Sequence, residues 1–233
     1  MTHLTTIGFD ADDTLWQNET FFRLTEERFA ALLAEHGDLP SIRARLLETE
    51  KRNLQFYGFG IKGFTLSMIE TALELTDNDA PASLVRDILT FGREMARHPV
   101  EPLAEAAETL ERLAGRYRLV LITKGDLFDQ ERKLAASGLG ELFQAVEIVS
   151  DKTEATYAKV FDRHGDGPTR AMMVGNSLRS DVLPALAAGA WGVHVPHELT
   201  WEYEHAEAPL EAPRFRRIEG LADLPGLLEE IEG

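Results

Sequence analysis

The chain has 233 residues, 44% hydrophobic and 27% charged, which is typical of a globular protein long enough to bury a full core. It has no cysteine, which excludes disulfides, thiolate metal sites and a cysteine nucleophile. Its 24 Lys and Arg against 40 Asp and Glu give a net charge of −16, so we expect neither nucleic acid nor a membrane as a partner. Neither a signal peptide nor a membrane-spanning run is recognisable, so we expect a cytoplasmic protein.

The first half of the chain begins with a strand and continues as helices. An apolar strand is predicted at 4–9, and it runs directly into the acidic segment 10–13. From there to about residue 97, apolar residues recur at three- and four-residue spacing, and no strand pattern interrupts them. The expected helices and the glycine-rich turn within this insertion lie at 17–37, 41–56, 57–63 (turn), 64–75 and 82–96.

The second half alternates strands with helices, which predicts parallel βαβ units. Strands are expected at 118–122, 146–149, 171–174, 193–195 and 215–218. Helices are expected at 103–114, 127–137, 153–164, 181–188 and 221–231. The sequence therefore predicts an α/β fold, a Rossmann-like doubly wound parallel sheet core made of 1–15 and 98–233, with 16–97 inserted as an α-helical domain.

Ligands bind at the carboxyl ends of parallel strands, and these ends carry reactive side chains. Asp10 and Asp12 stand two residues apart after the first strand, so they point the same way and repel unless a cation such as Mg²⁺ binds between them. Asp181 after another strand completes an oxygen cage. A hydroxyl at Thr123 and an ammonium at Lys152 suit a transferring phosphoryl group. A carboxylate can attack phosphorus and form an aspartyl-phosphate.

These segments, in this order, resemble the four motifs of the haloacid dehalogenase superfamily over nearly the whole chain. The first is D-x-D-x-T at 10–14, the second Thr123, the third Lys152, and the fourth 175–181 before a helix that ends at 188–189. The resemblance implies a phosphatase-type hydrolase whose insertion is a helical cap of type one. Its expected substrate is a small phosphorylated metabolite; the oligomeric state is left open.

The resemblance also implies a role for each motif residue. Asp10 is the expected nucleophile, and Asp12 the general acid that protonates the leaving alkoxide and then activates water. A true dehalogenase lacks this second aspartate, because a halide leaves without a proton, so Asp12 favours phosphoryl chemistry. Thr123 and Lys152 complete the catalytic set. The expected ligands of Mg²⁺ are Asp10, the backbone carbonyl of Asp12, and Asn176 or Asp181.

The sequence departs from the family pattern at three positions. Asn176 replaces the first acid of the fourth motif, which removes a charge from the metal site. Lys124 stands where many relatives have Asn, and adds a positive charge near the expected phosphate, so we expect it to bind substrate. Lys152 precedes Thr153 instead of the usual proline; Lys159 is the rival lysine but falls in the middle of a helix.

Two further segments invite a functional interpretation. In the turn 57–63, three glycines surround Lys62, and the family's helical caps present such a loop to the substrate, so we expect Lys62 to bind its non-reacting part. The aromatic and acidic segment 201–205 favours an amphipathic surface turn over a site.

Three other functions remain open at this point. A phosphomutase of the same family would return the phosphoryl group to another hydroxyl. A signalling receiver module also uses acids, a Ser or Thr and a Lys, but it is about half as long and lacks the helical insertion. A non-catalytic phosphate-binding relative would have no reason to keep Asp10, Asp12, Thr123, Lys152 and Asp181 together.

Overall fold

The computed structural model of the protein describes residues 3–233 and contains a six-stranded, fully parallel sheet in the order β3-β2-β1-β4-β5-β6. The strands are β1 (Thr6–Phe9), β2 (Arg118–Lys124), β3 (Ala145–Val149), β4 (Ala171–Gly175), β5 (Trp191–His194) and β6 (Phe215–Arg217). Each lies within a few residues of a predicted strand. The predicted Rossmann-like fold class is therefore confirmed.

Strand β1 lies at the centre of the sheet and is buried along its whole length. It pairs with β2 on one side and β4 on the other, so Gly8 lies opposite Val120 and Met173. A Cβ atom at Gly8 would approach Ile122 Cδ1 to 2.8 Å, so the close packing leaves room only for glycine. This burial on both faces fits the sequence of β1, which has one threonine and no charged residue.

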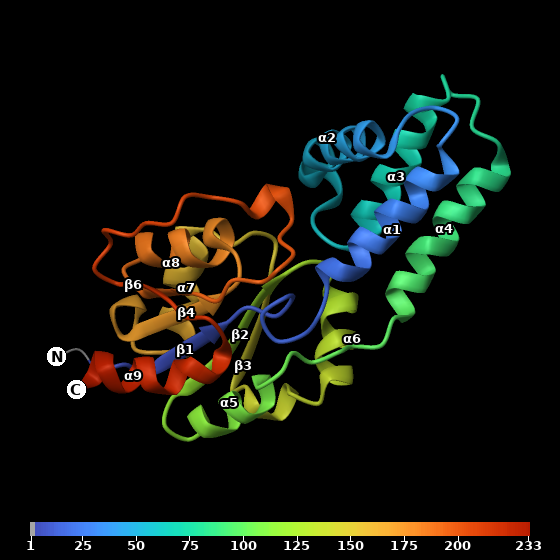
Figure 1. Ribbon diagram of the computed structural model, residues 1–233. Helices are drawn as coiled ribbons and strands as arrows, with labels where there is room; N and C mark the ends of the chain where they lie inside the picture. The colour runs from blue at the N-terminus through green and yellow to red at the C-terminus, as the bar shows by residue number, and fades with distance from the viewer. Residues whose placement is uncertain (1–2) are drawn as a thin grey trace. The chain divides into compact units, whose positions relative to one another are not determined.

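Helices cover both faces of the sheet, as a doubly wound fold requires (Figure 1). Apolar residues of α5 and α9 pack in one buried cluster with one face, and residues of α7 and α8 pack in a second cluster with the other. The helices around the sheet are α5 (Ala106–Leu113), α6 (Leu127–Ser137), α7 (Glu154–His164), α8 (Leu183–Ala187) and α9 (Leu224–Glu232). A π-helical turn, Leu178–Val182, precedes α8 and was not predicted from the sequence.

The chain divides into two compact units. The α/β unit comprises the chain up to Glu19, Val100–Lys124 and Gln130–Gly233, and the helical unit comprises Thr20–Pro99 together with Gly125–Asp129. The helical unit has its own buried apolar cluster, which includes Phe29, Ile42 and Met68. Its helices are α1 (Glu19–Leu32), α2 (Leu39–Tyr57), α3 (Ile61–Leu75) and α4 (Ala82–Arg97).

The turn between α2 and α3 is shorter than predicted. It consists of Gly58–Gly60, where Gly58 (φ 68°) and Gly60 (φ 111°) adopt backbone conformations that favour glycine. Helix α3 begins at Ile61, so Lys62 lies in the first turn of a helix and not in a loop.

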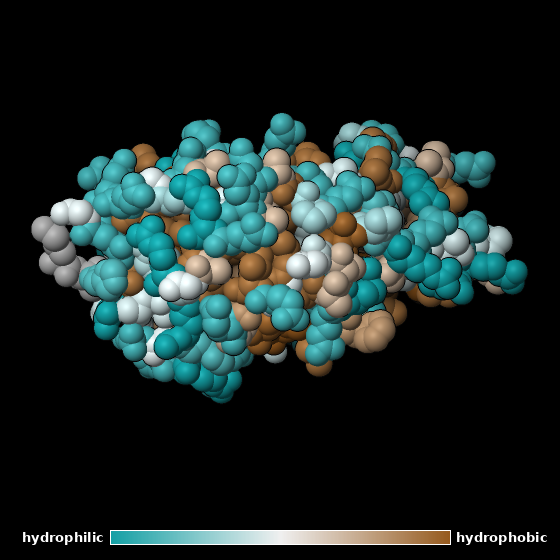
Figure 2. Space-filling model, turned by 90° about the horizontal axis from the view of Figure 1, so that it is seen from below, coloured by the Kyte–Doolittle hydropathy of each residue, from teal (hydrophilic) through white to brown (hydrophobic). Residues whose placement is uncertain are grey.

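Hydrophilic side chains predominate on the face shown in Figure 2, with apolar side chains between them. Among residues 3–233, no helix has the length and apolar character to cross a membrane.

Candidate active site

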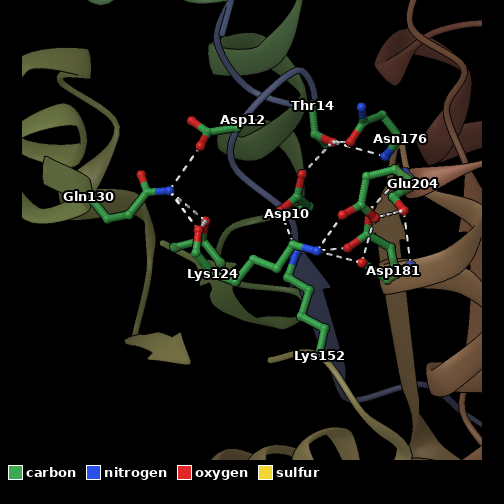
Figure 3. Close-up of polar contacts among 12 residues, drawn as sticks. Asp10, Asp12, Thr14, Lys124, Gln130, Lys152, Asn176, Asp181 and Glu204 are labelled. Carbon is green, nitrogen blue, oxygen red and sulfur yellow. Dashed lines mark hydrogen bonds and ion pairs between the residues drawn. The ribbon is translucent and has the colours of Figure 1, made fainter. Parts of the chain in front are cut away.

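Asp10 follows β1 directly and lies at the centre of a buried charged cluster. Its backbone N–H donates to Val174 O at 2.9 Å, which continues the pairing with β4, and its residue surface is only 7% exposed. The ammonium of Lys152, after β3, contacts the Asp10 carboxylate and lies 2.7 Å from Asp181 Oδ1 (Figure 3). Three side chains from three strand ends therefore meet, as the sheet order predicts.

The electrostatics of this cluster leave a negative charge uncompensated. Burial, and after it the charge of Asp181, raises the pKa of Asp10 to about 7, although Lys152 opposes both. Burial acts to lower the pKa of Lys152, but the charges of Asp10 and Asp181 outweigh it and raise that pKa. Two buried carboxylates share one ammonium, so the cluster favours a further cation.

The prediction that the Asp10 and Asp12 side chains point the same way is wrong, because the Asp12 carboxylate is turned away from this cluster and toward helix α6 (Figure 3). It accepts hydrogen bonds from Trp16 Nε1 at 2.6 Å and Gln130 Nε2 at 2.9 Å, and it pairs with Lys133 Nζ at 2.6 Å. Burial acts to raise the pKa of Asp12, but Lys133, Gln130 and Trp16 together lower it. Asp12 is therefore held as a carboxylate.

Thr14 connects the first and fourth motifs. Its Oγ1 lies 3.1 Å from Asp10 Oδ2 and 3.4 Å from Asn176 Oδ1, and it accepts the backbone N–H of Asn176 at 3.0 Å. The amide oxygen of Asn176 therefore lies on the same side of the site as Asp10.

Thr123 lies near the end of β2 and is 2% exposed. Gln130 Nε2 lies 3.2 Å from Thr123 Oγ1 and 2.9 Å from the backbone oxygen of Lys124, besides its bond to Asp12. The amide of Gln130 thus links the ends of β1 and β2. We did not predict a role for this residue.

A Mg²⁺ site here would need side-chain and backbone oxygens together. Among residues 3–233, no three Asp, Glu or His side chains gather closely enough to hold a metal ion by themselves. Asp10, Asn176 and Asp181 nevertheless come together as oxygen donors around an excess negative charge, which suits a hard cation that prefers oxygen ligands. The residues present fit Mg²⁺ if Asn176 and a backbone carbonyl, such as that of Asp12, complete the ligand set.

Lys124 forms an ion pair with Glu204, which lies in the segment 201–205 that was predicted as a surface turn. Its ammonium contacts a carboxylate oxygen of Glu204 and lies 2.7 Å from Ser180 Oγ. The Glu204 side chain is only 11% exposed and accepts further bonds from Ser177 Oγ and Ser180 Oγ, each at 2.5 Å. The interpretation of 201–205 as a mere surface turn is therefore wrong for Glu204.

The two remaining lysine candidates differ in their surroundings. Lys159 is exposed on α7, so Lys152 is the lysine that meets Asp10. Lys62 belongs to the helical unit, where its ammonium lies 2.9 Å from Asp126 Oδ2 and its side chain is 69% exposed. Its expected role toward substrate stays a prediction.

Three side chains of the site were missed at the level of sequence: Gln130, Lys133 and Glu204. The sequence of α6 gave no signal for the first two, because the helix directs Gln130 and Lys133 inward while Leu127 and Phe128 are 58% and 72% exposed. This inverts the usual arrangement of an amphipathic helix. For Glu204, no sequence pattern separates it from the neighbouring acids.

The site has a buried carboxylate after the first strand of a Rossmann-like sheet, where Lys152 contacts both this carboxylate and Asp181. The family model of haloacid dehalogenase-like hydrolases matches residues 4–189. The chain belongs to this family.

Similar proteins agree with this assignment. A haloacid dehalogenase-like family hydrolase from Xanthomonas campestris has a crystal structure with a TM-score of 0.87 and 42% identity, over 98% of this chain and 91% of that one. Glyceraldehyde 3-phosphate phosphatase of Methanothermobacter thermautotrophicus is 28% identical over 88% of this chain and 91% of its own. N-acylneuraminate-9-phosphatase of Mus musculus is 28% identical over 53% of this chain and 50% of its own.

Proposed function

We propose that the protein is a Mg²⁺-dependent phosphatase that hydrolyses a small phosphorylated metabolite through an aspartyl-phosphate on Asp10. The observation that carries this proposal is the buried Asp10, held by Lys152 beside Asp181, together with a second aspartate two residues further on. A dehalogenase has no use for that second acid, since a halide leaves without a proton. The two phosphatases among the relatives support the same reaction class.

In the first step, one carboxylate oxygen of Asp10 attacks phosphorus as the bond from phosphorus to the leaving oxygen breaks. Protonated Asp12 gives its proton to that oxygen, and the alcohol departs. Because Lys133 and Gln130 hold Asp12 ionised, it must take up a proton and leave these partners before it acts as an acid. In the second step Asp12 removes a proton from water, the water oxygen attacks phosphorus, and Asp10 is released with orthophosphate.

The surrounding residues bind and orient the phosphoryl group. Lys152 stays charged and offers its ammonium to the phosphoryl oxygens, while the hydroxyl of Thr123 donates to another of them. Asp10, Asn176, Asp181 and the backbone carbonyl of Asp12 would hold Mg²⁺. When bound, the ion neutralises charge on the phosphoryl oxygens and keeps Asp10 ionised.

The helical segment 16–97 is proposed to act as the cap that selects the substrate. It follows the first motif in the chain and forms a unit with its own apolar cluster. We expect its residues, Lys62 among them, to affect substrate binding more than the chemical step.

The proposal is tested with p-nitrophenyl phosphate as substrate. We expect turnover that stops when a chelator removes the metal and returns on addition of Mg²⁺. Asp10→Asn should reduce turnover to the background of the assay, whereas the matched variant Asp166→Asn, at an exposed position, should retain it. Full activity of Asp10→Asn, or activity indifferent to chelator, would contradict the proposal. Release of an isomeric phosphate ester in place of orthophosphate would favour a mutase.

A further inference from the structure

Glu204 brings a buried negative charge to the site from outside the four motifs. It ends the short helical turn Glu202–Glu204, which lies beyond β5 in the chain. Burial acts to raise the pKa of Glu204, but Lys124 and the hydroxyls of Ser177 and Ser180 lower it. The carboxylate therefore carries its charge at neutral pH.

Glu204 is connected to the nucleophile through an unbroken series of contacts. Ser177, whose hydroxyl donates to Glu204, also donates its backbone N–H to Asp181 Oδ2 at 2.9 Å. Asp181 in turn shares the ammonium of Lys152 with Asp10. Figure 3 shows Glu204 beside Asp181, on the side of the site formed by the fourth motif.

The turn that carries Glu204 is attached to the fourth motif at a second point. The guanidinium of Arg179 lies 3.9 Å from the centre of the Tyr203 ring, and its Nη1 donates to the backbone oxygen of Tyr203 at 3.2 Å. Trp201 packs against the same ring, with 4.9 Å between ring centres. These contacts fix the turn, so Glu204 is a built part of the site.

The lysines at the strand ends are consequently matched by carboxylates. Lys152 is shared by Asp10 and Asp181, as described above, and Lys124 is neutralised by Glu204. Lys124 follows Thr123, the expected phosphoryl-binding hydroxyl, so without Glu204 its charge would favour a second anionic group on the substrate.

We propose that Glu204 is a specificity-determining residue: by neutralising Lys124, it restricts the site to phosphate monoesters whose leaving alcohol carries no negative charge. This inference rests on the proposed phosphatase function and adds the class of leaving group. A carboxylate or second phosphate on the leaving alcohol meets the charge of Glu204, and Lys124 is not free to compensate it.

The test compares sn-glycerol 3-phosphate with 3-phosphoglycerate, which have the same three-carbon skeleton and differ in a carboxylate. Both are measured as substrates and as competitive inhibitors of p-nitrophenyl phosphate hydrolysis. The measured quantity is the preference, the ratio of kcat/KM or of inhibition constants for the two esters. The wild-type protein should prefer the uncharged glycerol ester.

Two substitutions should move this preference in opposite directions. Glu204→Gln keeps the shape and hydrogen bonding of the side chain but removes its charge, and should lower the preference about tenfold, as expected for one charge in a partly buried site. Lys124→Met leaves Glu204 without its cation and should raise the preference. Glu204→Asp, which retains the charge, should keep the wild-type preference. If Glu204→Gln does not fold, the change in preference that Lys124→Met causes tests the role of Glu204 by itself.

The outcomes separate this inference from the proposed function. Hydrolysis of p-nitrophenyl phosphate with an unchanged preference in Glu204→Gln and Lys124→Met would overturn the role of Glu204 and leave the phosphatase function standing. A wild-type preference for 3-phosphoglycerate, or inhibition by neither ester, would overturn it as well. Absence of Mg²⁺-dependent hydrolysis of any ester would overturn the proposed function, and this inference with it.

Discussion

The α/β unit and the helical unit bury their polar side chains in different ways. In helices α1–α4, all of them described, the buried polar residues include two charged ones, Glu19 and Glu26, both in α1. Several others are threonines that donate to a carbonyl four residues earlier, as Thr49 does to Arg45 O at 3.1 Å. Several buried hydroxyls of the helical unit are therefore satisfied within single helices.

The α/β unit instead buries charges that come from distant parts of the chain. Asp10, Lys152 and Asp181 are each less than 9% exposed. Asp10 precedes the other two by more than a hundred residues in the chain. Burying such groups costs stability unless they are paired and hydrogen-bonded, so this arrangement points to function. The buried charges that the proposed chemical step uses therefore lie in the α/β unit.

The largest effect short of complete loss is expected at Asp12. Asp12→Asn removes proton transfer, which commonly contributes about 10²–10⁴-fold to turnover. The loss in the rate of alcohol release in the first turnover should be large for alkyl phosphates and small for p-nitrophenyl phosphate, whose leaving group needs no proton. Single-turnover kinetics on both esters measures it. Equal activity of Asp12→Asn and wild type on alkyl phosphates would remove the assigned role.

The second effect tests the buried ammonium. Lys152→Met should lower kcat by about 10²–10³-fold, the usual loss when one charge-stabilising donor is removed. The exposed Lys159 provides the matched control, since Lys159→Met should change kcat by less than about twofold. Circular dichroism must show that both variants are folded. Equal tolerance of the two substitutions would contradict the assignment of Lys152.

The sequence predicted the sheet and the central cluster for identifiable physical reasons. A buried parallel strand such as β1 is largely apolar and lacks charged residues. The carboxyl ends of parallel strands share one edge, so Asp10, Lys152 and Asp181 were expected to meet. Gln130 and Lys133 were not predicted because the inward direction of α6 follows from packing and opposes its apolar pattern. Glu204 lies in a segment without periodicity, where only the fold reveals its partners.

A smaller effect is expected at the amide of the fourth motif. Asn176→Asp adds a charge to the proposed ligand set, and should lower the Mg²⁺ concentration needed for half-maximal activity by about three- to tenfold, because ligand charge tightens binding of hard cations. A titration of activity with Mg²⁺ measures it. An unchanged titration would show that residue 176 does not bind the metal.

The smallest effect is expected in the helical unit. Lys62→Ala should raise KM for the natural substrate by about two- to fivefold, the range of an exposed ion pair, and leave kcat and p-nitrophenyl phosphate turnover nearly unchanged. Lys51→Ala, at an exposed position of α2, is the control. A fall in kcat with constant KM would contradict the division of roles between the two units.

The most direct test of the account is the site of the covalent intermediate. Asp12→Asn is mixed with p-nitrophenyl phosphate and Mg²⁺, quenched in acid within the first turnover, digested and analysed by mass spectrometry. Since this variant keeps the nucleophile but lacks the base that activates water, the phosphorylated enzyme should accumulate. The account predicts one phosphoryl group on Asp10. Turnover with no phosphorylated peptide, or a phosphoryl group on any other residue, would contradict it.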